Sequence, residues 1–472
     1  MNRIDPLMNE RHVIDHLDAR QPEIVDWLKA FLRIPSVSAD PSFAPHMHEA
    51  RRFLLERLQR IGLSGVRLLD GGGEPAVYGE WNGAPGQPTL MVYGHYDVQP
   101  ADPLDQWHTP PFEPTEVGGR LYGRGTSDVK GSTAIALEVI ASFLAVQGRC
   151  PVNIKVFLEG EEETGSPSLR TIVERHRALL QADAVLSADG GRASADVPTI
   201  NTGARGNAQL EVRLRTAHKD LHSGRYGGGV RNALHEMARL VASLHHPDGG
   251  VAVKGFHDGA ASPTERQRAD TAAFPYDEAA FFSDVGGSAH GEPGYTARER
   301  ITLRPALDVN GLWGGYTGGG GKTIVPCEAQ AKLTTRVVAG QDPRAVIHAV
   351  LHHLQRHCPP GCTLDVVAMN DGSPASTLAP HHPLVSAAEA VLERESGLRP
   401  IHVRLGASVP VTAIFKEMLG IDTLMFGFNL PDEDVHAPNE FFRLASIRQG
   451  TRAWTLLLAE LAKHPPASFH VG

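Results

Sequence analysis

The sequence contains little of what marks several common classes of protein. Only four of its 472 residues are cysteine, at Cys150, Cys327, Cys358 and Cys362. They do not form two closely spaced pairs, which argues against a structural zinc knuckle. So few cysteines in so long a chain indicate a reducing compartment rather than a framework of disulfides.

Long apolar runs and an excess of positive charge are also missing. No run of about 18 apolar residues occurs, so we expect no segment to span a membrane. Residues 1–20 are polar and lack the apolar core of a secretion signal, so we expect a cytoplasmic protein. The formal net charge is −9. A nucleic-acid partner is therefore not expected, because it requires a basic face.

What the chain does contain predicts a large α/β protein. Hydrophobic residues make up 41% and charged residues 21% of the sequence, a balance typical of folded domains. Short apolar runs predict buried strands at 89–93, 152–158 and 184–187. Segments with helical periodicity lie between or beside them, at 24–34, 48–61 and 131–144. Strands that alternate with helices predict a mostly parallel sheet with helices on both faces.

The pattern changes near residue 203 and returns near residue 380. Residues 210–215 alternate strictly between apolar and polar, which predicts a sheet with one wet face. Further helices and strands are expected at 231–246, 332–338, 345–357 and 364–369, with an irregular stretch at 247–322. We therefore predict an α/β domain split into 1–204 and 379–472. We expect a smaller α+β domain, 205–378, to be inserted between its parts.

Residues with metal-binding side chains follow several predicted strands. His95 and Asp97 end the first strand, and side chains two positions apart point to the same side, so Asp97 can orient the imidazole. Taken alone, such a pair is more often an incidental surface feature. Asp128 precedes a predicted helix, where the N-cap is the commoner role of a lone aspartate.

The next strands end in more carboxylates. Glu161, Glu162 and Glu163 follow the strand at 152–158, at the edge where open α/β sheets bind ligands. A run of charges is usually a solvated surface, but three adjacent carboxylates gain most from a bound cation. Asp189 follows a strand, where a turn residue is the ordinary interpretation. His436 lies in a late acidic segment, 432–436.

Taken together, these positions predict a centre with two metal ions. Asp128, Glu163 and Asp189 supply three negative charges, and a bridging hydroxide would balance the fourth charge of two dications. Mixed imidazole and carboxylate ligands suit Zn²⁺ and tolerate Mn²⁺ or Co²⁺. One carboxylate must remain uncoordinated to accept a proton from water. Glu162, which is adjacent to a ligand, is the candidate.

Three strings resemble one family of metallopeptidases. They are Gly-His-Tyr-Asp-Val-Gln-Pro at 94–100, Gly-Arg-Gly-Thr-Ser-Asp-Val-Lys-Gly at 123–131 and Glu-Gly-Glu-Glu-Glu-Thr-Gly-Ser at 159–166. The family includes carnosinase and cytosolic nonspecific dipeptidase. Aminoacylases, glutamate carboxypeptidase and succinyl-diaminopimelate desuccinylase are more distant members. The similarity extends from about residue 24 to the last predicted helix.

The resemblance implies a role for each residue of the metal centre. His95, Asp128 and Asp189 would bind one ion, and Asp128, Glu163 and His436 the other, so that Asp128 bridges them. Glu162 would act as general base and acid, and Asp97 would orient His95. These roles agree with the assignment reached from the strand ends and from the charges.

The resemblance also implies that 1–204 and 379–472 form the catalytic domain and that 205–378 is a lid and dimerisation domain. The string Asp-Leu-His-Ser-Gly at 220–224 implies that His222 stabilises the oxyanion in the other subunit of a homodimer. Thr323, in the string at 321–326, would be offered across the same dimer. Arg336 and Ser408 would hold the substrate carboxylate, and arginine suits that task because it binds carboxylates through two donors.

Three positions depart from the family pattern. Leu405 replaces a common glutamate, Ala407 replaces a glycine, and Asn370 stands where dipeptidases place a substrate-binding histidine. We therefore expect an altered specificity pocket around an unaltered metal centre. The predicted reaction is hydrolysis of a dipeptide, or removal of a C-terminal residue, at the amide next to a free carboxylate. An N-acyl amino acid amidohydrolase is the alternative, and a non-catalytic metal-binding protein is a weaker one.

Overall fold

The computed structural model describes residues 6–470 and divides into two compact units. The first consists of Met1–Thr202, Leu378–Val403 and Pro410–Gly472, and the second of Gly203–Thr377 and Arg404–Val409. The chain therefore leaves the first unit, returns to it, and enters the second again for six residues. The three predicted ranges did not assign residues 404–409 to the inserted domain. The assignment of the units to catalysis and dimerisation stays a prediction.

The first unit is built on a sheet whose centre is parallel. Its strands follow the order β1-β2-β6-β3-β7-β17-β8. The four central strands are parallel to one another, and the pairs at both sides of them are antiparallel. The strands are β1 (Ser64–Leu69), β2 (Ala76–Trp81), β3 (Thr89–His95), β6 (Asn153–Glu159), β7 (Ala184–Ser187), β8 (Thr199–Ala204) and β17 (Asp422–Met425). The predicted mostly parallel sheet is confirmed.

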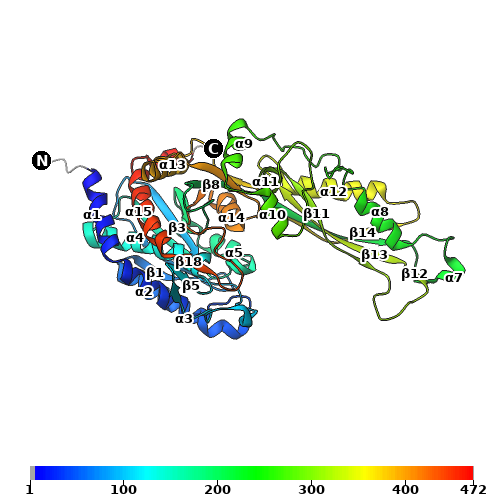
Figure 1. Cartoon of the computed structure of the whole chain (residues 1–472), viewed down its shortest axis with the longest axis horizontal. Helices are drawn as coiled ribbons and strands as arrows, with labels where there is room; N and C mark the ends of the chain where they lie inside the picture. Colours follow the sequence, from blue (N-terminus) through cyan, green and yellow to red (C-terminus); the bar gives the residue numbers. More distant parts are fainter. Residues whose placement is uncertain (1–5, 471–472) are drawn as a thin grey trace. The chain divides into compact units, whose positions relative to one another are not determined.

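Helices bury the apolar residues of this sheet. They are α1 (Pro6–Ala19), α2 (Gln21–Leu32), α3 (Ala44–Ile61), α4 (Gly131–Gln147), α5 (Leu169–Arg175), α6 (Arg177–Leu180), α13 (Pro383–Ser396), α14 (Pro410–Leu419) and α15 (Leu444–Leu461). Shorter strands are β4 (Thr115–Val117), β5 (Arg120–Tyr122), β16 (Ile401–Leu405) and β18 (Phe441–Arg443). Helices α1, α4 and α15 pack side by side (Figure 1).

Helix α4 is the most apolar helix of the first unit. By length and composition alone, Thr126–Gln147 would reach across a membrane, but 78% of its most apolar stretch is buried inside the protein. Its residues belong to the same hydrophobic core as β3, β6 and α15. The apolar character of α4 is thus explained by packing within a folded unit.

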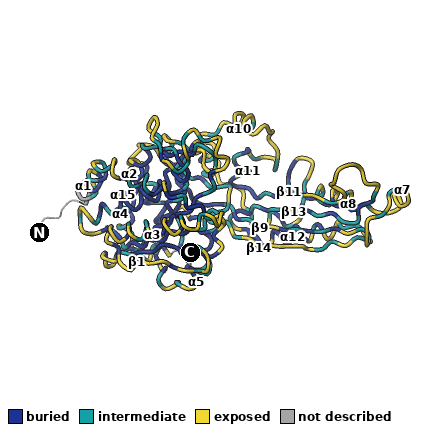
Figure 2. Tube along the Cα trace, turned by 90° about the horizontal axis from the view of Figure 1, so that it is seen from below, coloured by how far each residue is buried: buried dark blue, intermediate teal, exposed yellow. Residues whose placement is uncertain are grey.

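The second unit is an antiparallel sheet in the order β11-β13-β9-β14, with α8 and α12 packed on its apolar face. Its strands are β9 (Gly206–Arg215), β10 (Leu221–His222), β11 (Ala306–Gly314), β12 (Ile324–Val325), β13 (Glu328–Val337), β14 (Thr363–Ser373) and β15 (Ser376–Thr377). Its helices are α7 (Ser223–Tyr226), α8 (Ala233–Ala242), α9 (Glu265–Ala273), α10 (Glu278–Asp284), α11 (Ala297–Leu303) and α12 (Pro343–His357). The segment around α7 is exposed (Figure 2).

One prediction for this unit is wrong. The stretch 247–322 was expected to be irregular, but it contains α9, α10, α11 and the edge strand β11. The pairing of β11 with β13 shifts register between Val309 and Gly311, and most of the strand's residues are exposed or half-buried. An irregular edge strand of this kind lacks the strict alternation by which strands are recognised in a sequence.

Candidate metal centre

The candidate ligands lie where parallel strands of the first unit end. His95 is the last residue of β3, and a short turn at Glu162–Thr164 follows β6. Asp189 comes two residues after the end of β7. Since β6, β3 and β7 are neighbours and run parallel, their carboxyl ends meet at one edge of the sheet. This edge is where open α/β sheets hold ligands.

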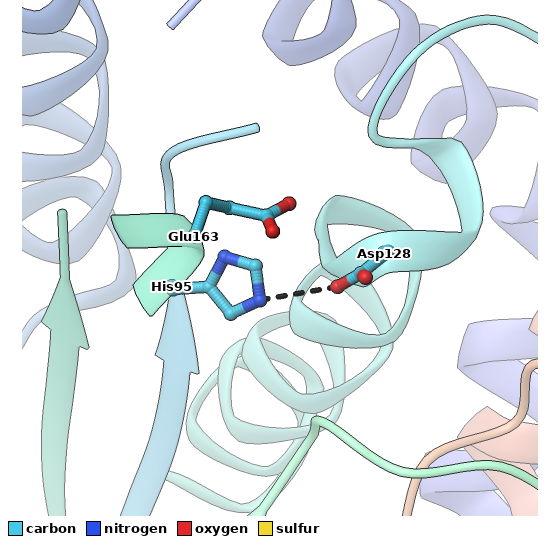
Figure 3. Close-up of side chains that lie close together, drawn as sticks. All are labelled: His95, Asp128 and Glu163. Atoms are coloured by element: carbon cyan, nitrogen blue, oxygen red, sulfur yellow. Dashed lines mark hydrogen bonds and ion pairs between the residues drawn. The ribbon is translucent and has the colours of Figure 1, made fainter. Parts of the chain in front are cut away.

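Three of the predicted ligands converge closely. His95, Asp128 and Glu163 each offer an atom within 4.8 Å of the atoms offered by the other two. His95 Nε2 lies 3.1 Å from Asp128 Oδ1 (Figure 3). His95 is fully buried, so its imidazole is held in one place by the surrounding core.

His436 lies close to the same two carboxylates, those of Asp128 and Glu163. Its Nε2 lies 3.0 Å from Asp128 Oδ2 and 3.2 Å from Glu163 Oε2. The backbone φ of His436 is +63°, and that of Asn439 is +69°. Non-glycine residues adopt this region at a cost and are often found at functional sites. The two oxygens of Asp128 thus face two different histidines, as a carboxylate that bridges two metal ions would.

The predicted contact between His95 and Asp97 involves both the backbone oxygen and the carboxylate of Asp97. His95 Nδ1 lies 3.1 Å from the backbone oxygen of Asp97 and 3.4 Å from its Oδ1. The carbonyl is therefore the closer partner of the imidazole. Asp97 Oδ2 instead accepts hydrogen bonds from Ser38 Oγ at 2.7 Å and from the backbone N of Glu163 at 3.1 Å. Asp97 links the end of β3 to the turn after β6.

Gln99 is a residue of the site that the sequence reasoning missed. Its Nε2 donates to Glu163 Oε2 at 2.9 Å. Gln99 belongs to the string at 94–100, so its place in that motif was the signal that could have identified it. The amide holds one oxygen of Glu163, and His436 lies against that same oxygen.

The carboxylates of the site repel one another in a buried place. Burial and the charges of Asp189 and Asp128 raise the pKa of Glu162 to about 8. Burial and Asp128 raise the pKa of Asp189 to about 6. Burial alone would raise the pKa of Asp128, but hydrogen bonds with His436 and His95 hold it below its usual range. Such a cluster fits divalent cations, because a bound cation offsets the repulsion.

The remaining predicted residues belong to the second unit. His222 pairs with Ile324 in the β10–β12 ladder. The backbone N of Ser223 donates to the backbone oxygen of Thr323 at 3.0 Å, and this bond brings His222 and Thr323 close together. The His222 ring is exposed, and its Nδ1 accepts from the Gly224 backbone N at 3.0 Å.

Arg336 and Ser408, predicted to hold one carboxylate, are in direct contact. Arg336 Nη1 donates to Ser408 Oγ at 2.9 Å. Asn370, in contrast, is an exposed residue of β14, and its Oδ1 accepts from the Gly372 backbone N at 2.9 Å. Within the described residues, the structure brings Asn370 into hydrogen-bond contact with neither Arg336 nor Ser408.

Imidazole and carboxylate side chains that converge at the carboxyl edge of a parallel sheet are typical of metal-dependent hydrolases. Residues 91–460 match the model of peptidase family M20/M25/M40, and the chain belongs to that family. The resemblance read from the three motifs is therefore confirmed, and so is the expectation of a metallopeptidase.

Similar proteins cover nearly the whole chain. Cys-Gly metallodipeptidase dug1 of Schizosaccharomyces pombe is 28% identical over 466 residues, 95% of this chain and 98% of that protein. Human Beta-Ala-His dipeptidase is 28% identical over 481 residues, 96% of this chain and 92% of that protein. The structure of an M20 family metallo-carboxypeptidase from Sulfolobus solfataricus is 30% identical, with a TM-score of 0.78 over 94% of this chain and all of that one.

Proposed function

We propose that the chain is a dipeptidase that cleaves the amide bond next to a free carboxylate. The observation that carries this proposal is the position of Asp128, whose two oxygens face His95 and His436 separately. A site of that form suits two ions and the hydrolysis of an unactivated amide. The relatives named as dipeptidases match this chain along almost its whole length, which favours a free dipeptide as the substrate.

The residues present fit two divalent ions, for which Zn²⁺ is our proposal and Mn²⁺ or Co²⁺ the alternatives. His95 and Asp189 would hold one ion, Glu163 and His436 the other, and Asp128 both. When bound, such ions supply Lewis acidity to the substrate carbonyl and to water.

Glu162 is the proposed proton carrier. No hydrogen bond to its side chain occurs within residues 6–470, although the carboxylates of Asp189 and Asp128 lie near it. An uncommitted carboxylate can take a proton from the attacking water and give it to the leaving amine. Through its contact with the turn that carries Glu162 and Glu163, Asp97 would keep this carboxylate in place.

Two positively charged side chains of the second unit, those of Arg205 and Arg336, favour recognition of a carboxylate. Arg205 donates to the backbone oxygens of Gly406 at 2.8 Å and of Arg304 at 3.1 Å, and so supports the segment that carries Ser408. Burial and the charge of Arg336 lower the pKa of Arg205 to about 10. Two neighbouring guanidinium groups attract an anion, and Arg336 with Ser408 would bind it directly.

The assembly and location that we propose follow the same family pattern. A homodimer would place His222 and Thr323 of one subunit at the substrate of the other. Leu405, Ala407 and Asn370 would set the preference for particular side chains. We propose a cytoplasmic protein, in keeping with the free cysteines, and no role for nucleic acid or membranes.

A substrate panel tests this proposal. Free dipeptides, tripeptides and N-acyl amino acids should be assayed with metal-free protein and after addition of Zn²⁺ or Mn²⁺. We expect dipeptide hydrolysis that a strong chelator abolishes and a divalent ion restores. Full activity in protein that elemental analysis shows to be metal-free would overturn the proposal. Cleavage of N-acyl amino acids without cleavage of dipeptides would favour the amidohydrolase alternative.

A further inference from the structure

Two buried glutamates stand beside the metal centre and have no part in the proposed chemistry. Glu433 and Glu440 are both 0% exposed, which is rare for a carboxylate without a specific task. They flank His436 in the sequence, three residues before it and four residues after it. The question is what a buried charge contributes at each position.

Glu440 accepts hydrogen bonds from the backbone of the loop that leads to Asp128. Its Oε2 accepts hydrogen bonds from Arg124 Nη1 and from the backbone N of Gly125, both at 2.8 Å. Its Oε1 accepts from the backbone N of Ser127 at 2.8 Å and of Asp128 at 3.1 Å. Four donors therefore meet the two oxygens of one carboxylate.

The loop needs such a partner because its own conformation is irregular. Asp128 has φ −116° and ψ 95°, which are not helical, so the turn at Thr126–Lys130 does not continue α4 backwards as a regular helix. Buried backbone N–H groups without an acceptor are costly. The carboxylate of Glu440 replaces the carbonyl oxygens that a helix would have offered.

Glu433 holds the same loop at a second point. Its Oε2 accepts from Ser127 Oγ at 2.8 Å and from the backbone N of Leu430 at 2.9 Å. Its Oε1 lies 3.1 Å from Arg443 Nη1. The segment that carries His436 is thus joined to the loop that carries Asp128 on both sides of the histidine.

We propose that Glu440 is a positioning residue that sets Asp128 against His436 and thereby determines the affinity of the metal centre. It bonds directly to the backbone N of Asp128 and lies four residues from His436, so a single side chain links the two. The inference rests on the proposed function, since it assumes that Asp128 and His436 bind metal. Side chains that orient metal ligands typically contribute about 10–100-fold to affinity.

The variant Glu440→Gln tests this role because it keeps the size of the side chain. An amide has one accepting oxygen, and its NH₂ group would face N–H donors. Glu138→Gln is the matched control, because Glu138 is also buried, is ion-paired with Arg57 and lies within α4. Zn²⁺ affinity should be measured by competition with a chromogenic chelator, and Tm, kcat and KM for a dipeptide in parallel.

We expect Glu440→Gln to bind Zn²⁺ about 10–100-fold more weakly. Its kcat should fall at limiting Zn²⁺ and recover with excess, while KM stays within about twofold of wild type. Glu138→Gln should lower Tm and leave Zn²⁺ affinity unchanged. If Glu440→Gln lacks a cooperative thermal transition, the Zn²⁺ affinity of Glu440→Asp is compared with that of wild type in its place. Aspartate keeps the charge but is one methylene shorter.

Two results would overturn the inference. One is equal Zn²⁺ affinity in Glu440→Gln and wild type, and the other is an equal loss in Glu138→Gln, which would show a general effect of destabilisation. Wild-type protein that binds no Zn²⁺ would instead refute the metal centre itself. The two failures are therefore distinguishable.

Discussion

Glu162 and Glu163 are neighbours in the sequence, yet their side chains have different surroundings. Glu163 Oε2 accepts from Gln99 at 2.9 Å and lies 3.2 Å from His436 Nε2, and its side chain is 3% exposed. Glu162 has no such partner within residues 6–470, and its raised pKa reflects burial near other carboxylates. One carboxylate is thus committed to the ligand cluster, and the other is available to move a proton.

Substitution with glutamine should separate these two roles. We expect Glu162→Gln to lower kcat by about 10²–10⁴-fold, the usual contribution of general acid–base catalysis, with metal content nearly unchanged. Glu163→Gln should lower the metal content measured by elemental analysis. Metal loss in the first variant with retention in the second would reverse the assignment. A loss of kcat below about tenfold in Glu162→Gln would also contradict it.

Arg336 offers a separate test of substrate recognition. A charge-assisted hydrogen bond contributes on the order of 1.5–3 kcal/mol, so Arg336→Ala should raise KM for dipeptides roughly 10- to 150-fold. Metal content should not change. Arg213 lies on a neighbouring strand of the same sheet and makes a long ion pair with Asp365 at 3.8 Å, so Arg213→Ala is the control. Equal rates on a dipeptide and its amide would show that no carboxylate is recognised.

At the scale of elements, the segments after β7 and β17 cross at two glycines. A Cβ added to Gly427 would lie 1.7 Å from the backbone oxygen of Gly190 and 2.7 Å from that of Ala188. Backbone atoms cannot move aside as a flexible side chain does. This close crossing fixes the segment that contains Asp189, between the two residues that Gly427 approaches.

Gly427→Ala should therefore destabilise the protein and disturb the metal centre together. Overpacking of this kind costs about 1–3 kcal/mol, and we expect a lower Tm and a lower metal content. Gly319 has no atom within 4 Å of an added Cβ, so Gly319→Ala is the control and should leave Tm unchanged. A Gly427→Ala variant with the Tm of wild type would contradict the close crossing.

The elements also show what the sequence could predict and what it could not. The buried central strands β3, β6 and β7 were predicted because each contains a short run of mostly apolar residues, and His95, Glu163 and Asp189 lie at or just after their ends. Edge strand β11 was missed because most of its residues contact solvent. Glu440 was missed because its partners, three backbone N–H groups and the Arg124 side chain, lie more than 300 residues away in the sequence, which no local pattern reveals.

At the scale of the whole molecule, the residues that we propose for metal binding and for substrate binding are divided between the two units. All five proposed metal ligands belong to the first unit, whereas His222, Thr323, Arg336 and Ser408 belong to the second. His222 is exposed on a short two-stranded ladder. Its exposed ring is compatible with contact to the substrate of another subunit, which is the arrangement that the family resemblance implies.

Complementation between two inactive variants tests that arrangement and the mechanism together. Removal of an oxyanion donor typically costs about 10²–10³-fold in turnover, so His222→Ala should be nearly inactive with its metals bound. Glu162→Gln should be nearly inactive because it cannot move the proton. If His222 serves the neighbouring subunit, each mixed dimer contains one site with an intact Glu162 from one chain and an intact His222 from the other. At full exchange about half of the dimers are mixed, so activity should recover to about a quarter of wild type when the sites act independently.

The measurement is dipeptide hydrolysis after subunit exchange, with exchange verified by mass spectrometry of differently tagged chains. Absence of recovery despite complete exchange would show that His222 acts within its own chain or has no catalytic role.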